Sequence, residues 1–375
     1  MNFSDQVLKN EERALYELRR LYQQYGYTRY KVSKFEEYDL YAHNKSFLVS
    51  ENILTFTDTN GKLMALKPDV TLSIVKNIGN DDIAAHKLYY NETVYRTSQG
   101  SDGFCEIMQT GLECIGEIDL YAIGEVLMLA QKSLALISDD YILDLSHLGF
   151  LTGLLEETDL NARDTETLIG LIGNKNIPAI GAFCRSHGVD EEMTASICSV
   201  TDLYAPLDSA LEQIRPMVKG EKMQAAYEQL CGVCEMMRVC GDTKRLYLDF
   251  SIVNDMNYYT GIIFRGFING IPDGVLSGGR YDSLLQKMGK RSGAIGFAVY
   301  LDLLERFGAW ERTYDVDTLL VYDDTTDSAT VIGTAAALRE TGKTVLTQKG
   351  ENTTVRCHEK LRITKGGLKV LETND

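Results

Sequence analysis

The chain has 375 residues, 44% of them hydrophobic and 25% charged, so neither a disordered nor a fibrous protein fits the composition. With 38 Lys and Arg against 54 Asp and Glu, the formal net charge is −16, which argues against polyanionic partners such as nucleic acid or an anionic membrane. The longest apolar stretches, such as residues 293–301, fall short of the ~18 residues that a membrane span needs.

The N-terminal part of the chain predicts one helix followed by an antiparallel sheet. Apolar residues recur at helical spacing from residue 5 to Gly26, which predicts an opening helix. Apolar and polar residues then alternate in short runs, and the turn residues Asn60 and Gly61 predict a hairpin between two of these runs. We expect strands over residues 53–56, 63–66, 87–95 and 104–115, and a helix that begins near Val70.

The middle of the chain is predicted to be mostly helical. Helical spacing covers residues 119–137 and then most of residues 147–243. Strand patterns resume over residues 245–251 and 261–267, before a turn at 270–274 and a helix from Tyr281. We therefore expect a β-rich core made of residues 1–146 and 244–312, interrupted by a helical insertion at 147–243.

Residues 313–375 predict a small, separate α/β unit. A strand over 318–322, a helix over 328–340 and a second strand over 344–346 form a βαβ pattern, and the residues that follow are weakly patterned. About sixty residues make at best a minimal domain. The unit is also rich in aspartate, so it is not expected to bind nucleic acid.

The cysteines and histidines predict no metal site. The chain has 8 cysteines and no N-terminal basic segment followed by an apolar one, so we expect a cytoplasmic protein with reduced thiols. Cys231 and Cys234 form a CxxC pair inside a predicted helix, but a zinc site needs a second pair. The five histidines show no HxxxH spacing, and no cofactor is predicted.

Four segments, taken together, resemble motifs of histidyl-tRNA synthetase, a class II aminoacyl-tRNA synthetase. The segments are LKPDVT at 66–71, which is similar to RPEGT; YR at 95–96 with QTGLE at 109–113, similar to motif 2; NYYTG at 257–261, at the place of RGLDYY; and GGRYD at 278–282 with GFA at 296–298, similar to the second histidine signature and motif 3. The resemblance covers residues 5 to about 308. It implies an α+β fold in which an antiparallel sheet is flanked by helices, and dimerisation through motif 1.

The residues that would act on ATP depart from the family pattern. Amino-acid activation gathers negative charge in its transition state, and family enzymes meet that charge with three arginines. Here only Arg96, in motif 2, remains. Asn254 and Asp255 replace the arginine of RGLDYY and its neighbour, Leu303 replaces the arginine of motif 3, and Tyr300 replaces a glycine. We therefore expect a catalytically inactive synthetase paralogue, with no catalytic residue assigned.

The amino-acid site that the resemblance implies is better preserved. Asp69 takes the place of a glutamate that holds the α-ammonium group, and two tyrosines can flank an imidazole. The candidate histidine-binding residues are Asp69, Thr71, Arg96, Gln109, Glu113, Tyr258 and Tyr259. Each of them also fits the ordinary polarity of a sheet surface, and Arg96 equally fits a structural ion pair.

We place the segment DLSHLGFL, residues 144–151, in the predicted helical block. This segment is similar to the DLGH-type segment of a sister family, the regulatory subunit of short-form ATP phosphoribosyltransferase. In that family a synthetase paralogue has lost aminoacylation and joins a small catalytic subunit in the first step of histidine biosynthesis. The resemblance implies a non-catalytic regulatory subunit that binds the catalytic subunit, takes histidine as effector and associates with itself through its core. An active, divergent histidyl-tRNA synthetase and a synthetase-like scaffold or amide-forming ligase stay open as alternatives.

Overall fold

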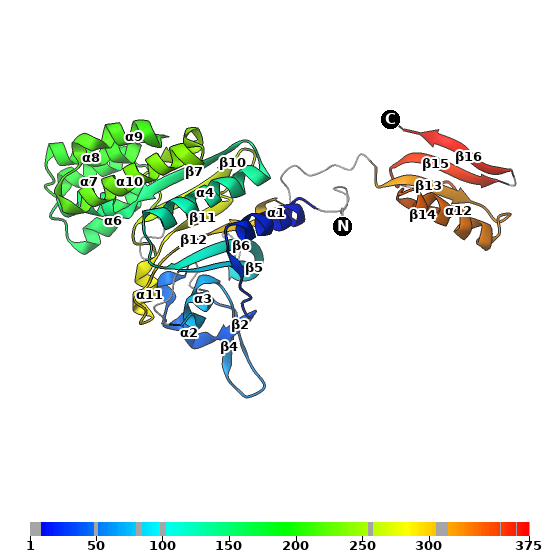
Figure 1. Ribbon diagram of the computed structural model, residues 1–375, viewed down its shortest axis with the longest axis horizontal. Helices are drawn as coiled ribbons and strands as arrows, with labels where there is room; N and C mark the ends of the chain where they lie inside the picture. Colours follow the sequence, from blue (N-terminus) through cyan, green and yellow to red (C-terminus); the bar gives the residue numbers. More distant parts are fainter. Residues whose placement is uncertain are drawn as a thin grey trace. The chain divides into compact units, whose positions relative to one another are not determined.

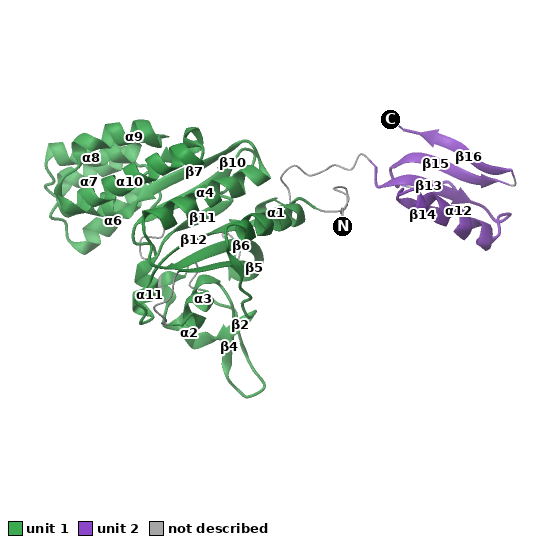
Figure 2. Ribbon diagram, viewed as in Figure 1, with its two compact units in different colours: residues 1–308 green, residues 309–375 purple. Residues whose placement is uncertain are grey.

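The structure is a computed structural model. It describes residues 9–48, 52–79, 85–97, 103–253, 258–304, 314–352, 354–364 and 366–374. The chain divides into two compact units, residues 1–308 and 309–375, which are coloured separately in Figure 2. Each unit is described by itself below.

Unit 1 is built around a nine-stranded sheet with the order β1-β5-β6-β12-β11-β10-β7-β9-β8 (Figure 1). The strands are β1 Thr28–Arg29, β5 His86–Thr97, β6 Phe104–Gly116, β7 Tyr141–His147, β8 Ala205–Pro206, β9 Leu246–Leu248, β10 Ile262–Ile268, β11 Leu276–Arg280 and β12 Gly293–Tyr300. From β5 to β7 every neighbouring pair is antiparallel, which confirms the predicted sheet. Two parallel pairs, β1 with β5 and β7 with β9, extend it and were not predicted.

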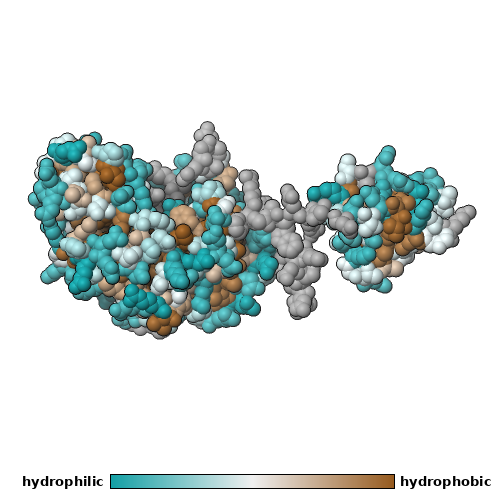
Figure 3. All heavy atoms as spheres, turned by 90° about the horizontal axis from the view of Figure 1, so that it is seen from above, coloured by the Kyte–Doolittle hydropathy of each residue, from teal (hydrophilic) through white to brown (hydrophobic). Residues whose placement is uncertain are grey.

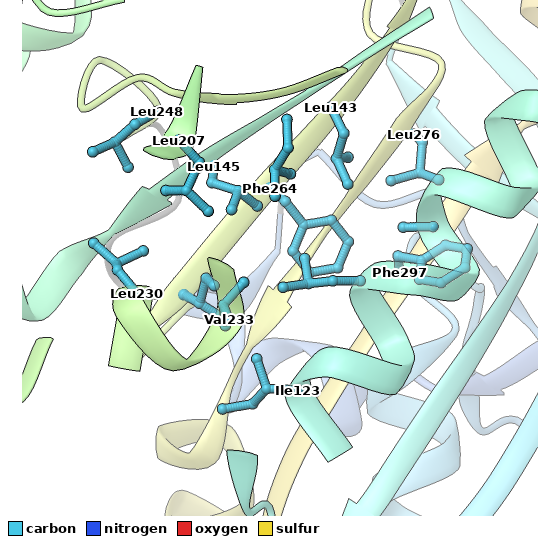
Figure 4. Packing of buried hydrophobic residues seen from close by; sticks show 14 of the residues in the cluster. Ile123, Leu143, Leu145, Leu207, Leu230, Val233, Leu248, Phe264, Leu276 and Phe297 are labelled. Carbon is cyan, nitrogen blue, oxygen red and sulfur yellow. The ribbon is translucent and has the colours of Figure 1, made fainter. Parts of the chain in front are cut away.

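One face of the sheet is apolar and carries two long helices, α1 (Asn10–Gln24) and α4 (Leu120–Ile137). Strand alternation places Leu112, Phe297, Phe264 and Leu145 on this face, and all four belong to one buried cluster. Figure 4 labels Phe297, Phe264 and Leu145 of this cluster. Helix α4 is apolar enough by length and composition to cross a membrane, but 61% of its 18-residue window is buried within unit 1. It is therefore a core helix.

The opposite face of the sheet is partly covered by a small layer from the N-terminal part of the chain. Its elements are β2 Phe35–Glu37, α2 Tyr38–Ala42, η1 Lys45–Phe47, β3 Thr55–Thr57, β4 Leu63–Leu66 and α3 Thr71–Asn77. A second buried cluster joins this layer to the sheet, with Leu72 and Ile74 of α3 beside Tyr90 of β5 and Tyr281 after β11. Helix α11 (Asp282–Lys287) packs beside β12.

The segment between β7 and β9 is almost entirely helical. Its elements are α5 Leu148–Glu156, α6 Ala162–Gly173, α7 Ile177–Ser186, α8 Glu191–Asp202, α9 Leu207–Ile214, η2 Arg215–Met217, α10 Gly220–Cys240 and η3 Thr243–Arg245. The prediction that Asp144 lies in the helical block is wrong, because residues 144–147 form the end of strand β7. In this strand the buried residues Leu143 and Leu145 alternate with polar residues. The division into a core and an insertion at 147–243 stays a prediction.

Unit 2 is a four-stranded sheet with the order β14-β13-β15-β16 and one helix. Its elements are β13 Val316–Tyr322, α12 Ser328–Glu340, β14 Val345–Lys349, β15 Cys357–Thr364 and β16 Gly367–Thr373. The predicted βαβ pattern is confirmed by the parallel pairing of β13 and β14. The hairpin β15–β16 was missed. Figure 3 shows a hydrophobic patch on one face of this unit. Among the described residues of the unit, the large apolar side chains that are exposed are Ile332, Leu346, Leu368 and Val370.

Candidate functional site

The segment between β4 and α3 is anchored to β5 by a buried ion pair. Lys67 Nζ lies 2.5 Å from Glu92 Oε2, and the two side chains are 1% and 11% exposed. Arg96 Nε donates to the carbonyl oxygen of Pro68 at 2.8 Å. The first turn of α3 is fixed in addition by Asp69, whose Oδ1 accepts from the backbone N–H of Leu72 at 2.8 Å. These contacts hold Asp69 at the helix N-terminus.

Glu113 lies at the centre of the candidate site. Its side chain projects from β6, and the residue is 2% exposed. Thr71 Oγ1 donates to Glu113 Oε1 at 2.8 Å, and the Tyr281 hydroxyl donates to Oε2 at 2.5 Å. Gly296, its cross-strand neighbour on β12, leaves room for the carboxylate, because a Cβ there would lie 1.9 Å from Oε2. The carboxyl group is thus held from both sides by hydroxyl donors.

The rings of Tyr281, Tyr258 and Tyr259 follow one another from this carboxyl group. The Tyr258 ring lies 5.5 Å from that of Tyr281 and 4.7 Å from that of Tyr259, with the second pair nearly perpendicular at 75°. Tyr259 in turn packs over Gly279, where a Cβ would lie 2.6 Å from its ring. Tyr258 and Tyr259 therefore form an aromatic wall, which suits an imidazole ring.

The structure brings together most of the predicted site residues. Asp69, Thr71, Glu113 and Tyr258 interact with one another, and with Tyr281 they are called the site cluster here. Arg96 acts on this cluster electrostatically, through Asp69. Gln109 lies four residues before Glu113 on the same face of β6 and is 3% exposed. Its cross-strand neighbour on β12 is Tyr300.

Sequence reasoning missed two tyrosines at this site. Tyr281 was named only as part of the GGRYD segment, although its presence in that segment could have indicated that it is a site residue. Tyr90 of β5 lies directly opposite Gly111, where a Cβ would lie 2.6 Å from its hydroxyl oxygen. A single tyrosine in a strand gives no signal of this kind, because the contact depends on the cross-strand register.

Burial makes the site cluster hold protons tightly. Burial is the main cause that raises the pKa of Glu113, the bonds from Tyr281 and Thr71 oppose the rise, and the nearby Asp69 adds to it, so that the pKa is about 8. Burial also raises the pKa of Asp69, against the effects of the Leu72 N–H and of Arg96. Two such carboxyl groups favour a ligand that brings a positively charged nitrogen.

The positions that should contact ATP offer few cations. Leu303 lies in η4 (Leu301–Leu304) and packs against the main apolar cluster. Tyr300 ends β12 on the same sheet face as Gln109. Arg96 is engaged with a backbone carbonyl. Asn254, Asp255 and the loop after Arg96 at 98–102 lie outside the described residues.

Known proteins are similar to this chain over most of its length. A family model described as histidyl-tRNA synthetase matches residues 3–304. An ATP phosphoribosyltransferase regulatory subunit from Clostridium kluyveri is 30% identical over 336 residues, which cover 87% of this chain and 85% of that protein. The chain belongs to the family of ATP phosphoribosyltransferase regulatory subunits. The protein of the same name from Oceanobacillus iheyensis is 27% identical over 359 residues, covering 94% of this chain and 87% of the relative.

Solved structures confirm the predicted fold class. An ATP phosphoribosyltransferase regulatory subunit/histidyl-tRNA synthetase from Bacillus halodurans aligns with a TM-score of 0.74 at 24% identity, over 92% of this chain and 90% of that one. Histidyl-tRNA synthetase from Nostoc gives a TM-score of 0.72 at 18% identity, over 97% and 92%. A chain of the ATP phosphoribosyl transferase (HisG:HisZ) complex from Thermotoga maritima gives 0.61 at 20%, over 78% and 97%. Regulatory subunits and synthetases of this family thus share one fold.

Proposed function

We propose that this chain is the regulatory subunit that a short-form ATP phosphoribosyltransferase requires in the first step of histidine biosynthesis, and that it acts in the cytoplasm. Its relatives carry that name over most of both chains. The observation that carries the proposal is an intact site cluster in a chain whose motif 3 arginine is replaced by the packed residue Leu303. Amino-acid recognition is retained while the charges for activation are not.

The partner in this proposal is the small catalytic subunit. Sedimentation of an equimolar mixture tests it, and we expect a species heavier than either component alone. Bovine serum albumin in place of this chain is the control. Independent sedimentation of the two proteins at micromolar concentration would reject the partner.

The proposal also states that this chain does not activate amino acids. Removing one preorganised contact to a developing charge costs about 100–1,000-fold in rate, and two arginines of the family pattern are replaced. We expect no histidine-dependent exchange of pyrophosphate into ATP above a blank without protein. Robust exchange would instead establish a divergent synthetase.

Histidine is the proposed effector, bound at the site cluster. The carboxyl group of Asp69 would take the α-ammonium group, and Tyr258 and Tyr259 would flank the imidazole. Calorimetric titration with L-histidine tests this, with Asp69→Asn as the variant expected to lose binding. Retention of full affinity in that variant would move the effector elsewhere.

Self-association is proposed through the small sheet β2-β4-β3. Phe35 and Phe56 are 48% and 37% exposed, and their rings meet edge to face at 5.6 Å. Exposed aromatic pairs of this kind are typical of interfaces. Light scattering should report a dimer for the native chain and a monomer for the double variant Phe35→Ser, Phe56→Ser. A dimer in both would exclude this sheet.

A further inference from the structure

Two carboxyl groups share the site cluster without an ion-pair partner. Among the described residues, the ion pairs within 4.0 Å involve neither Asp69 nor Glu113. Glu113 receives one hydroxyl donor on each oxygen. A carboxylate buried in this way is costly unless a cation or a proton neutralises it.

Among the described residues, the groups that face Glu113 are acidic or neutral. They are Asp69 and Thr71 at the start of α3, Tyr90 of β5, Tyr258 before β10 and Tyr281 after β11. Tyr27 and Cys114 lie on the other face of the sheet, and the charge of Glu113 opposes their ionisation. The one arginine of the site, Arg96, acts on Asp69. In the absence of ligand a proton is therefore the neutralising charge, which agrees with the raised pKa of Glu113.

We propose that a ligand's cationic amino group replaces this proton, so that binding at the site cluster releases one proton from Glu113 and the affinity of the site depends on pH. The inference deepens the proposed histidine site and rests on it. Before binding, the carboxyl group carries the proton and the ligand carries an ammonium group. After binding, the ammonium group is paired with the carboxylate of Glu113 as well as with that of Asp69, and the proton of Glu113 has passed to solvent. No other charge changes.

Proton release fixes the direction of the pH dependence. Below the pKa of Glu113 the proton must be removed before the ligand can pair with the carboxylate, so affinity rises by about tenfold per pH unit. Above that pKa the proton is already absent, and affinity levels off over the pH range in which the ligand's amino group is still protonated. The site would thus sense pH near neutrality.

Tyr281 is the positioning residue that sets this range. Its hydroxyl donates to Glu113 Oε2 and favours the ionised carboxyl group. The variant Tyr281→Phe keeps the buried ring against Tyr258 and removes the donor. The affinity of this variant for the ligand should therefore level off at a higher pH than the affinity of the native chain. At high pH, the affinities of the variant and the native chain should differ less than they do near neutral pH. A purely structural role would lower the affinity equally at every pH.

The test is calorimetric titration of the full chain with L-histidine in buffers of different ionisation enthalpy. At about pH 7 the native chain should release close to one proton per ligand. The near-isosteric Glu113→Gln variant should release none and bind with a flat pH profile. Circular dichroism confirms that each variant is folded, and Tyr281→Phe gives a second, independent readout.

Two results would overturn the inference in different ways. Binding of histidine without proton release, or with equal release in Glu113→Gln, would reject the proton exchange and leave the histidine site standing. No binding at any pH between about 6 and 9 would remove the histidine site itself, and the exchange with it. The regulatory role is measured separately, through the catalytic subunit.

Discussion

Glu113 is a buried acid whose ionisation works against the fold. Its pKa of about 8 lies above the ordinary value, so the folded protein holds the proton more tightly than the unfolded chain. The stabilisation from Glu113 is therefore fully present below the carboxyl's ordinary pKa and is lost as pH rises towards 8. In Glu113→Gln this loss is absent.

We expect the free energy of unfolding of the native chain, relative to Glu113→Gln, to fall by roughly 1 kcal/mol per pH unit between about pH 5 and 8. Urea unfolding at several pH values measures the difference. A constant difference over this range would show that Glu113 is ionised throughout and would contradict the account of its burial.

Gly296 matters through the space that it leaves. A Cβ there would lie 1.9 Å from Glu113 Oε2 and 2.4 Å from the backbone oxygen of Leu112, which cannot move cheaply. Gly296→Ala should destabilise the chain by at least about 1–3 kcal/mol and weaken histidine binding.

The matched control for this substitution is Gly170→Ala. Gly170 lies inside α6, and a Cβ there would meet no atom of a neighbouring element within 4 Å, so the change should stabilise by up to about 1 kcal/mol. Thermal unfolding and histidine titration of both variants decide the matter. Equal behaviour of the two variants would contradict the crowding at Gly296.

Motif order predicted several of the residues that meet in the candidate site, but not all of them. Asp69, Thr71, Glu113 and Tyr258 lie in three segments far apart in the sequence, and the structure joins them. Tyr281 stayed outside the prediction because its role depends on a hydrogen bond across the sheet to β6, which spacing along one segment does not encode.

At the scale of elements, the buried pair of Lys67 and Glu92 fastens the turn before α3 to strand β5. Lys67→Met would leave the Glu92 carboxylate buried without its partner, at a cost of about 3–5 kcal/mol. The control is Lys76→Met, since Lys76 pairs with Glu36 near the surface, where its side chain is 39% exposed. That change should cost less than about 1 kcal/mol.

Denaturant unfolding of the two lysine variants measures both values. The double variant Lys67→Met, Glu92→Leu should recover much of the lost stability, because it removes the stranded charge. A loss in Lys67→Met no larger than in Lys76→Met would show that the ion pair does not anchor the site.

The elements that sequence patterns predicted best are long and strongly periodic, such as α4 and β6. Strand β7 was missed because a strand that leads directly into α5 gives a mixed period over residues 141–156. Strand β15 was missed because Leu361 and Ile363 alternate with charged residues too briefly to stand out in an exposed unit. Both errors concern strands whose identity is decided by their neighbours in the sheet.

At the scale of the whole molecule, the chain has the fold of histidyl-tRNA synthetase. Its net charge of −16 does not favour tRNA, and Leu303 stands where the resemblance places an arginine of motif 3. Family membership fits a protein that acts through a partner, and we propose that the site cluster senses an amino acid.

The most direct measurement is a titration of this chain into a purified short-form ATP phosphoribosyltransferase catalytic subunit, with the rate of phosphoribosyl-ATP formation followed with and without histidine. We expect a saturable rise in rate on addition of the chain, and a histidine effect that is lost in Asp69→Ala. A rate that stays at the level of the catalytic subunit alone, at every ratio of the two proteins, would contradict the regulatory role.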